Sequence, residues 1–467
     1  MKFSVYPTAT CRPQSVHLRV SSTSILVLVL LSLSSRAAGQ TSTDVTIRSL
    51  QVHLKMYPQD FKSYDALGAS YIQKGRETAD ASYYELAKEA LNKSLDLVSN
   101  DPAAASAKTH MAVVAMAEHQ FEEALSWAQE ALAVGSGDPS PWAIVGDALT
   151  DMGEYDRAAD AYSRLCDPVN PKDQSSALAY ERNSRIAYLH FLKGDAPGAV
   201  KMMRTAIAVT STLHLPAENL AWSEYQLGEI CLKSGDFAGA EQAYRAGLEI
   251  EPHSYRNLAG LGELRTAQGK FPEAIALYQK AIAVVPYPAY ATALFDLDVQ
   301  LGRSDDAQKQ LALVEFISTS NPLNERLFYR ELALFYADHN LKLKQSVELA
   351  KKELAVRHDI YTWDILAWVL FKNGRTQEAA DAMDKALALG TKDALLDFHA
   401  GMIESQLGHS DRARSLLKGV LALNPNFHLI YAAQARATLS RLSDSAARTV
   451  SDGSPTTHGS TTGGSLE

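Results

Sequence analysis

The sequence predicts an all-α protein, a right-handed superhelical solenoid of about ten helical hairpins with flanking capping helices. A pattern of about 34 residues recurs along most of the chain, and a period of about 20 to 50 residues is typical of repeat proteins. Within each copy, small and aromatic residues recur at spacings of three and four, which places them on one stripe of a helix. A glycine near the middle of the copy supplies a tight turn between two helices.

Residues 1–39 have the layout of a signal peptide. Lys2, Arg12 and Arg19 precede the apolar run at residues 25–33, and no acidic residue precedes it. A helix needs about 20 apolar residues to span a bilayer, so this run is too short for a stable membrane span. We therefore expect export to the periplasm or the extracellular space, with cleavage after Gly39. An uncleaved anchor or a wrongly assigned start stays open as the alternative.

The composition excludes several classes of protein and of partner. Hydrophobic residues make up 46% of the chain and charged residues 21%, unlike collagen-like, disordered or disulfide-scaffold proteins. The formal net charge is -9, and loss of residues 1–39, with four basic and no acidic residues, would make it -13. A negative chain without a run of Lys or Arg is not expected to bind nucleic acid. Cys166 and Cys231 are about two repeats apart, too far for a disulfide, and we expect both to be buried thiols.

An amphipathic stretch, residues 45–57, predicts an N-terminal flanking helix within residues 40–60. The repeats then fill residues 61–425, with their clearest copies at residues 224–252 and 258–286. Both copies end in a proline, which stops the second helix because it lacks a backbone N–H and cannot continue the helix.

Ten copies align on one small residue of the second helix, with gaps of 33 to 41 residues. Longer gaps place insertions, expected to be loops between hairpins, at residues 168–176, 210–219 and 318–325. The aligned residues are Ala87, Ala124, Ala158, Ala199, Ala240, Ala274, Ala307, Ser346, Ala379 and Ala413. Seven of them have a turn glycine five residues earlier: Gly153, Gly194, Gly235, Gly269, Gly302, Gly374 and Gly408.

These copies resemble the tetratricopeptide repeat family, in its exported bacterial multi-repeat type, over residues 61–425. The first copy departs from the pattern by a longer turn at residues 76–82, and the eighth by Ser346 in place of alanine. The resemblance implies a function in binding other proteins.

The C-terminal end divides into two segments. Residues 426–442 contain an amphipathic stretch that we expect to form a capping helix, since the end of a solenoid needs a cover for its apolar face. Residues 443–467 are rich in Gly, Ser, Thr and Pro and low in hydrophobic residues, which predicts a disordered tail.

The resemblance places a partner-binding groove on the first helix of each hairpin. We expect aromatic side chains there to anchor a partner segment and acidic ones to select basic or polar donors. The alternative is that the aromatic side chains pack between hairpins. The aromatic and apolar candidates are Tyr188, Phe191, Trp222, Tyr225, Tyr361, Trp368, Phe371, Phe398 and Met402. The acidic candidates are Asp147, Asp151, Glu229, Glu263 and Asp296.

The sequence carries no HExxH, GxSxG, P-loop or CxxC motif, so we expect no catalytic residues, no metal and no cofactor. His399 and His409 have no set of acidic residues beside them in the sequence that would complete a metal site. The expected function is a non-catalytic scaffold or adaptor that binds peptide or protein segments in the groove. The alternative is a self-associating structural element of a cell-envelope assembly.

Overall fold

The computed structural model describes residues 42–98, 101–135, 137–166, 176–210, 213 and 217–452. Within these residues every regular element is a helix, which confirms the predicted all-α solenoid. The predicted signal peptide, residues 1–39, lies outside the described residues, as do residues 453–467 of the expected tail.

The described residues form ten helical hairpins, each a first helix packed on the second helix that follows it. The first and eighth copies, which depart from the repeat pattern, are both present. The ten pairs are α2 (Phe61–Thr78) with α3 (Ser82–Val98), α4 (Ala105–Ala117) with α5 (Phe121–Ala133), α6 (Pro141–Asp151) with α7 (Tyr155–Ser163), α8 (Ala177–Leu192) with α9 (Ala196–Thr210), α10 (Ala217–Lys233) with α11 (Phe237–Ile250), α12 (Tyr255–Ala267) with α13 (Phe271–Val284), α14 (Pro288–Gln300) with α15 (Ser304–Thr319), α17 (Tyr329–Asp338) with α18 (Leu343–Leu354), α19 (Ile360–Lys372) with α20 (Thr376–Ala386), and α21 (Ala394–Gln406) with α22 (Ser410–Leu423).

Further helices lie outside the hairpins. Helix α1 (Ser42–Met56) packs on α2, and the short η1 (Pro102–Ala104) precedes α4. The insertion at residues 318–325 is not a plain loop, because it contains the end of α15 and part of α16 (Pro322–Leu327).

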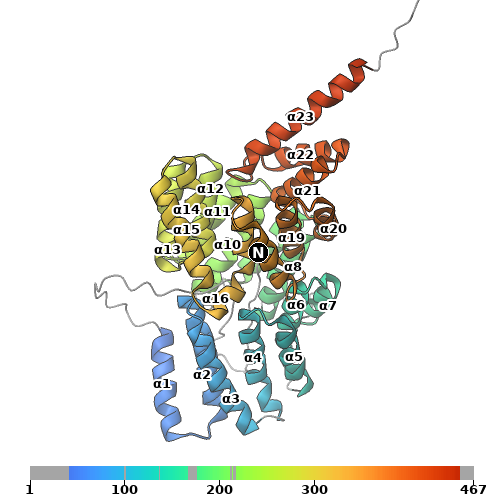
Figure 1. Ribbon diagram of the computed structural model, residues 1–467. Helices are drawn as coiled ribbons and strands as arrows, with labels where there is room; N and C mark the ends of the chain where they lie inside the picture. Colours follow the sequence, from blue (N-terminus) through green and yellow to red (C-terminus); the bar gives the residue numbers. More distant parts are fainter. Residues whose placement is uncertain are drawn as a thin grey trace, which may run out of the picture.

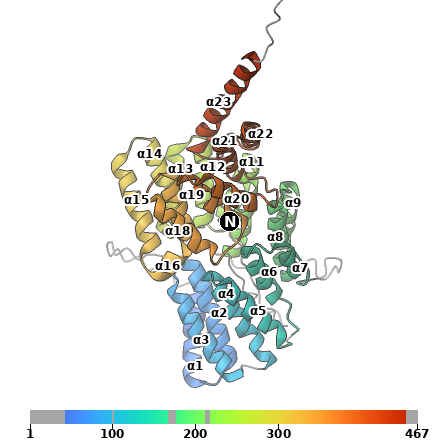
Figure 2. The ribbon, with the colours of Figure 1, turned by 45° about the vertical axis from the view of Figure 1, so that its right-hand side comes forward.

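Helix α23 (Tyr431–Asp452) follows the last hairpin and projects from the body at the C-terminal end (Figures 1 and 2). It continues through residues 443–452, where the composition predicts disorder. Continuing a formed helix adds one hydrogen bond for each residue that is fixed, so the helix extends further than the tail composition suggests.

The aligned small residues lie where the two helices of a hairpin come closest. Nine of the ten are 0% exposed, and Ala307 is 5% exposed. Ser346 fits this position because its hydroxyl donates to the carbonyl oxygen of Leu343, at 2.8 Å. Glycine on a first helix leaves room for an aromatic ring of the second helix. A Cβ atom on Gly228 would lie only 2.4 Å from the ring of Tyr244.

The predicted turn glycines adopt the left-handed conformation that favours glycine. All seven have φ between 70° and 82°. The second hairpin has no such glycine, and His119 takes the position with φ 59°. Histidine is among the few side chains enriched in this region of backbone conformation.

Successive turns of the superhelix touch one another. The turns within hairpins three, four and five contact the loops that follow hairpins eight, nine and ten, so each contact joins elements five hairpins apart. Three hydrogen bonds join them, from His358 N to Asp151 O at 2.9 Å, from Thr391 Oγ1 to Leu192 O, and from Asn424 Nδ2 to Leu232 O at 3.4 Å.

Glycine permits this close approach. A Cβ atom on Gly153, Gly194 or Gly235 would lie 2.6, 2.5 or 2.2 Å from a backbone carbonyl oxygen of the opposing loop. The equivalent glycine of hairpin six, Gly269, has the same backbone conformation but no atom within 4 Å of such a Cβ. The first three glycines therefore carry a second role beyond the turn itself.

This difference makes Gly235→Ala a test of the contact between superhelical turns, with Gly269→Ala as its matched control. Both replacements strain a positive φ, a loss of about 1 kcal/mol. Only Gly235→Ala also drives a methyl group into the carbonyl of Leu423. We expect it to lower the free energy of unfolding by at least about 1 kcal/mol more than the control, measured by urea denaturation. Equal losses would contradict the contact.

Candidate functional site

The first helices of hairpins five to eight surround a cavity of about 500 Å³, which we call the inner cavity. Helices α10, α12, α14 and α17 form its wall. Asp393 and the first two residues of α21 cover it from one end of hairpin ten, and residues 424 and 426–429 cover it from the other end. The cover exists because the superhelix closes on itself and brings these residues back to hairpin five. Residues that line the cavity include Tyr225, Glu229, Arg256, Glu263, Tyr290 and Asp296.

Three carboxylates follow one another along the wall of the inner cavity. Glu229, Glu263 and Asp296 each lie eleven residues before the aligned alanine of their hairpin, so they occupy the same face of α10, α12 and α14. Glu229 accepts a hydrogen bond from the hydroxyl of Tyr244 at 2.7 Å, and Asp296 lies 3.1 Å from Nε2 of His339. Among the described residues, Glu263 has no hydrogen-bond or ion-pair partner.

The surroundings oppose the ionisation of two of these acids. The exposed surface of Glu263 faces the cavity, and desolvation there, together with the carboxylate of Glu229, raises the pKa of Glu263 to about 7. Burial also raises the pKa of Glu229. The nearby cation, Lys233, pairs with Asp393 at 2.7 Å. Despite burial, that carboxylate raises the pKa of Lys233, so the lysine stays charged.

Tyrosine side chains form much of the remaining wall. The ring centroid of Tyr290 lies 6.4 Å from that of Tyr255 and 5.2 Å from that of Tyr287. The hydroxyl of Tyr287 donates to Glu331 at 2.8 Å. Tyr225 also lines the cavity, and its ring centroid lies 6.3 Å from that of Tyr244. The inner cavity therefore combines aromatic surface with carboxylates.

The sequence-predicted groove residues divide between the inner cavity and packed surroundings. Tyr225, Glu229, Glu263 and Asp296 line the inner cavity. Asp147, Asp151 and Tyr188 instead line a separate cavity of only about 10 Å³, too small for a partner side chain.

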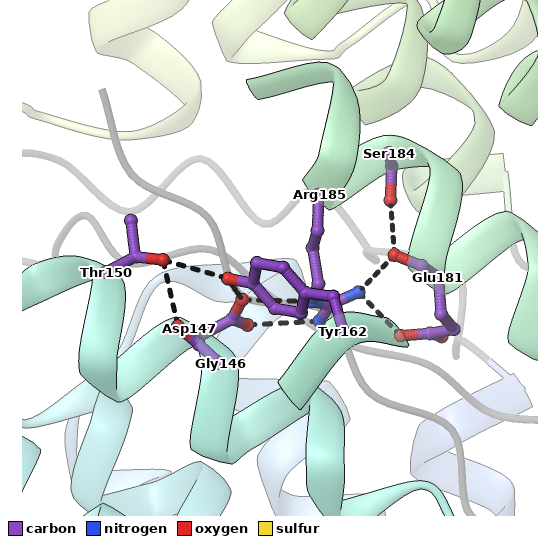
Figure 3. Close-up of polar contacts among 7 residues, drawn as sticks. All are labelled: Gly146, Asp147, Thr150, Tyr162, Glu181, Ser184 and Arg185. Carbon is purple, nitrogen blue, oxygen red and sulfur yellow. Dashed lines mark hydrogen bonds and ion pairs between the residues drawn. The ribbon is translucent and has the colours of Figure 1, made fainter. Parts of the chain in front are cut away.

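Asp147 belongs to a buried ionic network (Figure 3). It accepts two hydrogen bonds from Arg185, at 2.9 and 3.0 Å, and one from the hydroxyl of Tyr162 at 2.7 Å. Arg185 also pairs with Glu181 at 2.7 Å. Because Asp147 and Arg185 are 1% and 2% exposed, neither is open to a partner.

Asp151 lies at the contact between superhelical turns. Its carboxylate is 3.2 Å from Nε of Arg357, whose Nη1 is 3.1 Å from Glu353. The guanidinium of Arg357 lies 4.7 Å from the centre of the Phe121 ring, and the residue is 0% exposed. This arginine therefore joins the loop after hairpin eight to hairpins two and three.

Most of the predicted aromatic candidates pack between helices. Trp368 and Phe398 are 0% exposed, and the Trp368 ring lies 4.1 Å from the ring of His399. Phe371 stacks on Trp368 at 5.1 Å, and Tyr361 donates to Asp393 at 3.2 Å. The others are buried: Phe191, Trp222, Tyr188 and Met402. None of these residues lines the inner cavity, and their placement fits the alternative interpretation of packing between hairpins.

Sequence reasoning missed several residues of the inner cavity, among them Tyr255, Arg256, Tyr290, Arg330 and His428. One feature of the sequence does indicate the cavity wall: an acidic residue recurs at the same position of hairpins five, six and seven. No local signal marks the covering loops, because they reach the cavity only through contacts between distant hairpins.

A second depression, a groove of about 980 Å³, lies between α9 and the turn that follows α10. It is mostly apolar, with Val200, Arg204 and Cys231 among its lining residues. It contains none of the predicted groove residues. Cys231 is a buried thiol, as expected, whereas Cys166, which was expected to be buried as well, is partly exposed.

Two further features are absent from the described part of the chain. No group of three or more His, Cys, Asp or Glu side chains in these residues is arranged to hold a metal ion. No helix among them has the length and apolar character needed to cross a membrane.

Arg357→Ala would leave the carboxylates of Asp151 and Glu353 buried without their cation. We expect it to lower the free energy of unfolding by about 3–5 kcal/mol, since an unpaired buried charge is strongly destabilising. Arg375→Ala, which removes a surface pair with Glu378, should change stability by less than about 1 kcal/mol. Chemical denaturation of both variants measures the difference. A loss below about 1 kcal/mol for Arg357→Ala would show that the buried network does not hold the turns together.

Glu263→Gln should stabilise the protein at pH 8 but not at pH 4. The folded pKa of Glu263, about 7, is raised above its ordinary value of 4.5. Ionisation therefore destabilises the fold, and this penalty is absent below about pH 4.5, grows as the pH rises and is complete above about pH 7. Melting temperatures of wild type and variant across this range give the test. A constant difference at every pH would contradict the raised pKa.

Comparison with known proteins identifies the repeat. Residues 232–294 match the sequence model of a family described as tetratricopeptide repeat. The chain is similar to a tetratricopeptide repeat protein from Parabacteroides merdae, with 16% identity over 57% of this chain and 99% of that one, and a TM-score of 0.32. No curated protein sequence matches the chain.

Two further solved structures are similar. One is the Cut9-Hcn1 hetero-tetramer of the APC/C, with 15% identity, coverage of 86% of this chain and 90% of that one, and a TM-score of 0.32. The other is yeast Tom70, with 13% identity, coverage of 83% and 99%, and a TM-score of 0.33. The matched residues 232–294 contain hairpin six, whose turn glycine and buried alanine recur along the chain. Residues 232–294 are therefore similar in sequence to tetratricopeptide repeats, and the described residues repeat the same helical hairpin.

Proposed function

We propose that this protein is a non-catalytic scaffold that binds a segment of a partner protein in the inner cavity. The tetratricopeptide repeat fold is typical of scaffolds for protein–protein interaction. The observation that carries the proposal is the inner cavity itself, about 500 Å³ and lined by side chains of four consecutive first helices. A cavity with aromatic walls and a few polar groups is typical of a binding site.

The lining of the cavity suits a peptide segment. Tyrosines provide large contact areas with few rotatable bonds, so they lose little conformational freedom on binding. Peptide N–H groups and polar side chains of a bound segment would find acceptors in the carboxylates of Glu229 and Glu263. These groups stand on helices of the solenoid, which hold them in place before a partner arrives.

Two parts of the proposal rest on the sequence. The absence of hydrolase, nucleotide-phosphate and redox motifs supports a function without catalysis. Export to the periplasm or the cell exterior is supported by the basic and apolar segments of residues 1–39.

Ala289 offers a way to block the cavity without disturbing the core, because it is exposed and lies on the cavity lining. We expect Ala289→Trp to fill the entrance and to weaken, by about tenfold or more, the binding of peptides selected against the wild type from a random peptide library. Calorimetry of the selected peptides with each purified protein measures the Kd.

The matched control is Ala283→Trp, an exposed alanine on α13 outside the cavity. It should bind the selected peptides as the wild type does. Circular dichroism of both variants establishes that they fold. Equal affinity of Ala289→Trp and wild type would place the binding surface elsewhere and contradict the proposal.

A further inference from the structure

The inner cavity holds more acidic than basic side chains, and its bases already have partners. The lining contains the acids Glu229, Glu263, Asp296, Glu331 and Asp393, and the bases Lys233, Arg256 and Arg330. It also contains His428, whose pKa is lowered by burial. Each lysine or arginine lies beside a carboxylate: Lys233 is 2.7 Å from Asp393, Arg256 is 3.6 Å from Glu218, and Arg330 is 3.3 Å from Asp359. Glu229 and Glu263 therefore have no basic side chain within ion-pairing distance among the described residues.

A buried amide adds an unused acceptor to these carboxylates. Gln226 lines the inner cavity on the same helix as Glu229 and is 1% exposed. Its Oε1 atom has no hydrogen-bond partner in the described part of the molecule. A buried acceptor without a donor is destabilising, so a ligand that donates hydrogen bonds here would satisfy it.

The aromatic wall favours positive charge as well. The face of an aromatic ring attracts a cation within about 6 Å of its centre. The protein already uses this interaction at the cavity, where the guanidinium carbon of Arg256 lies 4.5 Å from the centre of the Tyr255 ring. Likewise, Nζ of Lys233 lies 5.4 Å from the centre of the Tyr361 ring. Tyr225 and Tyr290 also line the cavity and add further aromatic surface.

From the unpaired carboxylates, the unused amide oxygen and the tyrosine wall, we propose that the inner cavity is a receptor for an alkylammonium or guanidinium group. A lysine or arginine side chain of the bound segment supplies that group, an identification that rests on the proposed function. The group binds beside Glu263 and Glu229, where it donates hydrogen bonds and neutralises their charge. An anionic ligand is disfavoured, because Lys233, Arg256 and Arg330 are each already paired with a carboxylate.

The test compares three probes with the full chain at pH 8 by calorimetry. They are the capped tripeptide Gly-Lys-Gly, the same tripeptide with norleucine in place of lysine, and n-butylammonium. Norleucine keeps the apolar stem and removes the charge. We expect the lysine peptide to bind at least about tenfold more tightly than the norleucine peptide.

Glu263→Gln should remove most of this difference, since it keeps the shape of the side chain and has no contact to break. Glu249→Gln, which makes the same change at an exposed position on α11, should preserve it. Circular dichroism of each variant checks the fold.

The outcomes separate the two proposals. Equal binding of the lysine and norleucine peptides would overturn the cation receptor and leave the scaffold standing. Binding of n-butylammonium that depends on Glu263, without binding of any peptide, would support the cation receptor and overturn the scaffold. Failure of all three probes to bind would overturn the cation receptor, and an unchanged preference for lysine in Glu263→Gln would overturn its placement at that residue.

Discussion

Contact between successive turns of the superhelix gives this solenoid its shape. A solenoid of hairpins is stabilised mainly by neighbouring repeats, and nothing in that arrangement requires distant hairpins to meet. Here the turns of hairpins three to five touch loops five hairpins later, at Gly153, Gly194 and Gly235. Only a residue without a side chain allows the carbonyl groups to come so close. The contact turns an open inner surface into a covered cavity.

Buried charge lies along the same contact. The pair Asp151–Arg357, which joins hairpin three to the loop after hairpin eight, is almost wholly removed from solvent. Such pairs gain little stability over apolar side chains of similar size, but they strongly penalise any arrangement that separates them. They therefore favour one register between the two turns of the superhelix. That register also determines the shape of the inner cavity, because the residues that cover the cavity belong to the later superhelical turn, around hairpin ten.

The chemistry of the cavity follows from where charge is left uncompensated. The segment before hairpin ten supplies Asp393, which pairs with Lys233 at 2.7 Å, so this lysine only partly offsets the charge of Glu229 and Glu263. Desolvation raises the pKa values of both acids, and the carboxylate of Glu229 adds to the rise for Glu263. Placed between tyrosines, these carboxylates make the cavity attractive to a donor that carries positive charge. The segment that contains Asp393 thus both covers the cavity and pairs with its lysine.

The sequence by itself determined the hairpins: the buried alanines, the turn glycines and their spacing depend on contacts within a repeat, which a local pattern records. It also placed Tyr225, Glu229 and Glu263 on the inner helices. Glu263 and Trp368 nevertheless occupy the same position of their repeats, and one lines the cavity while the other packs against Tyr431 of α23. Only the tertiary structure decided between them, because the outcome depends on which distant segment covers that position.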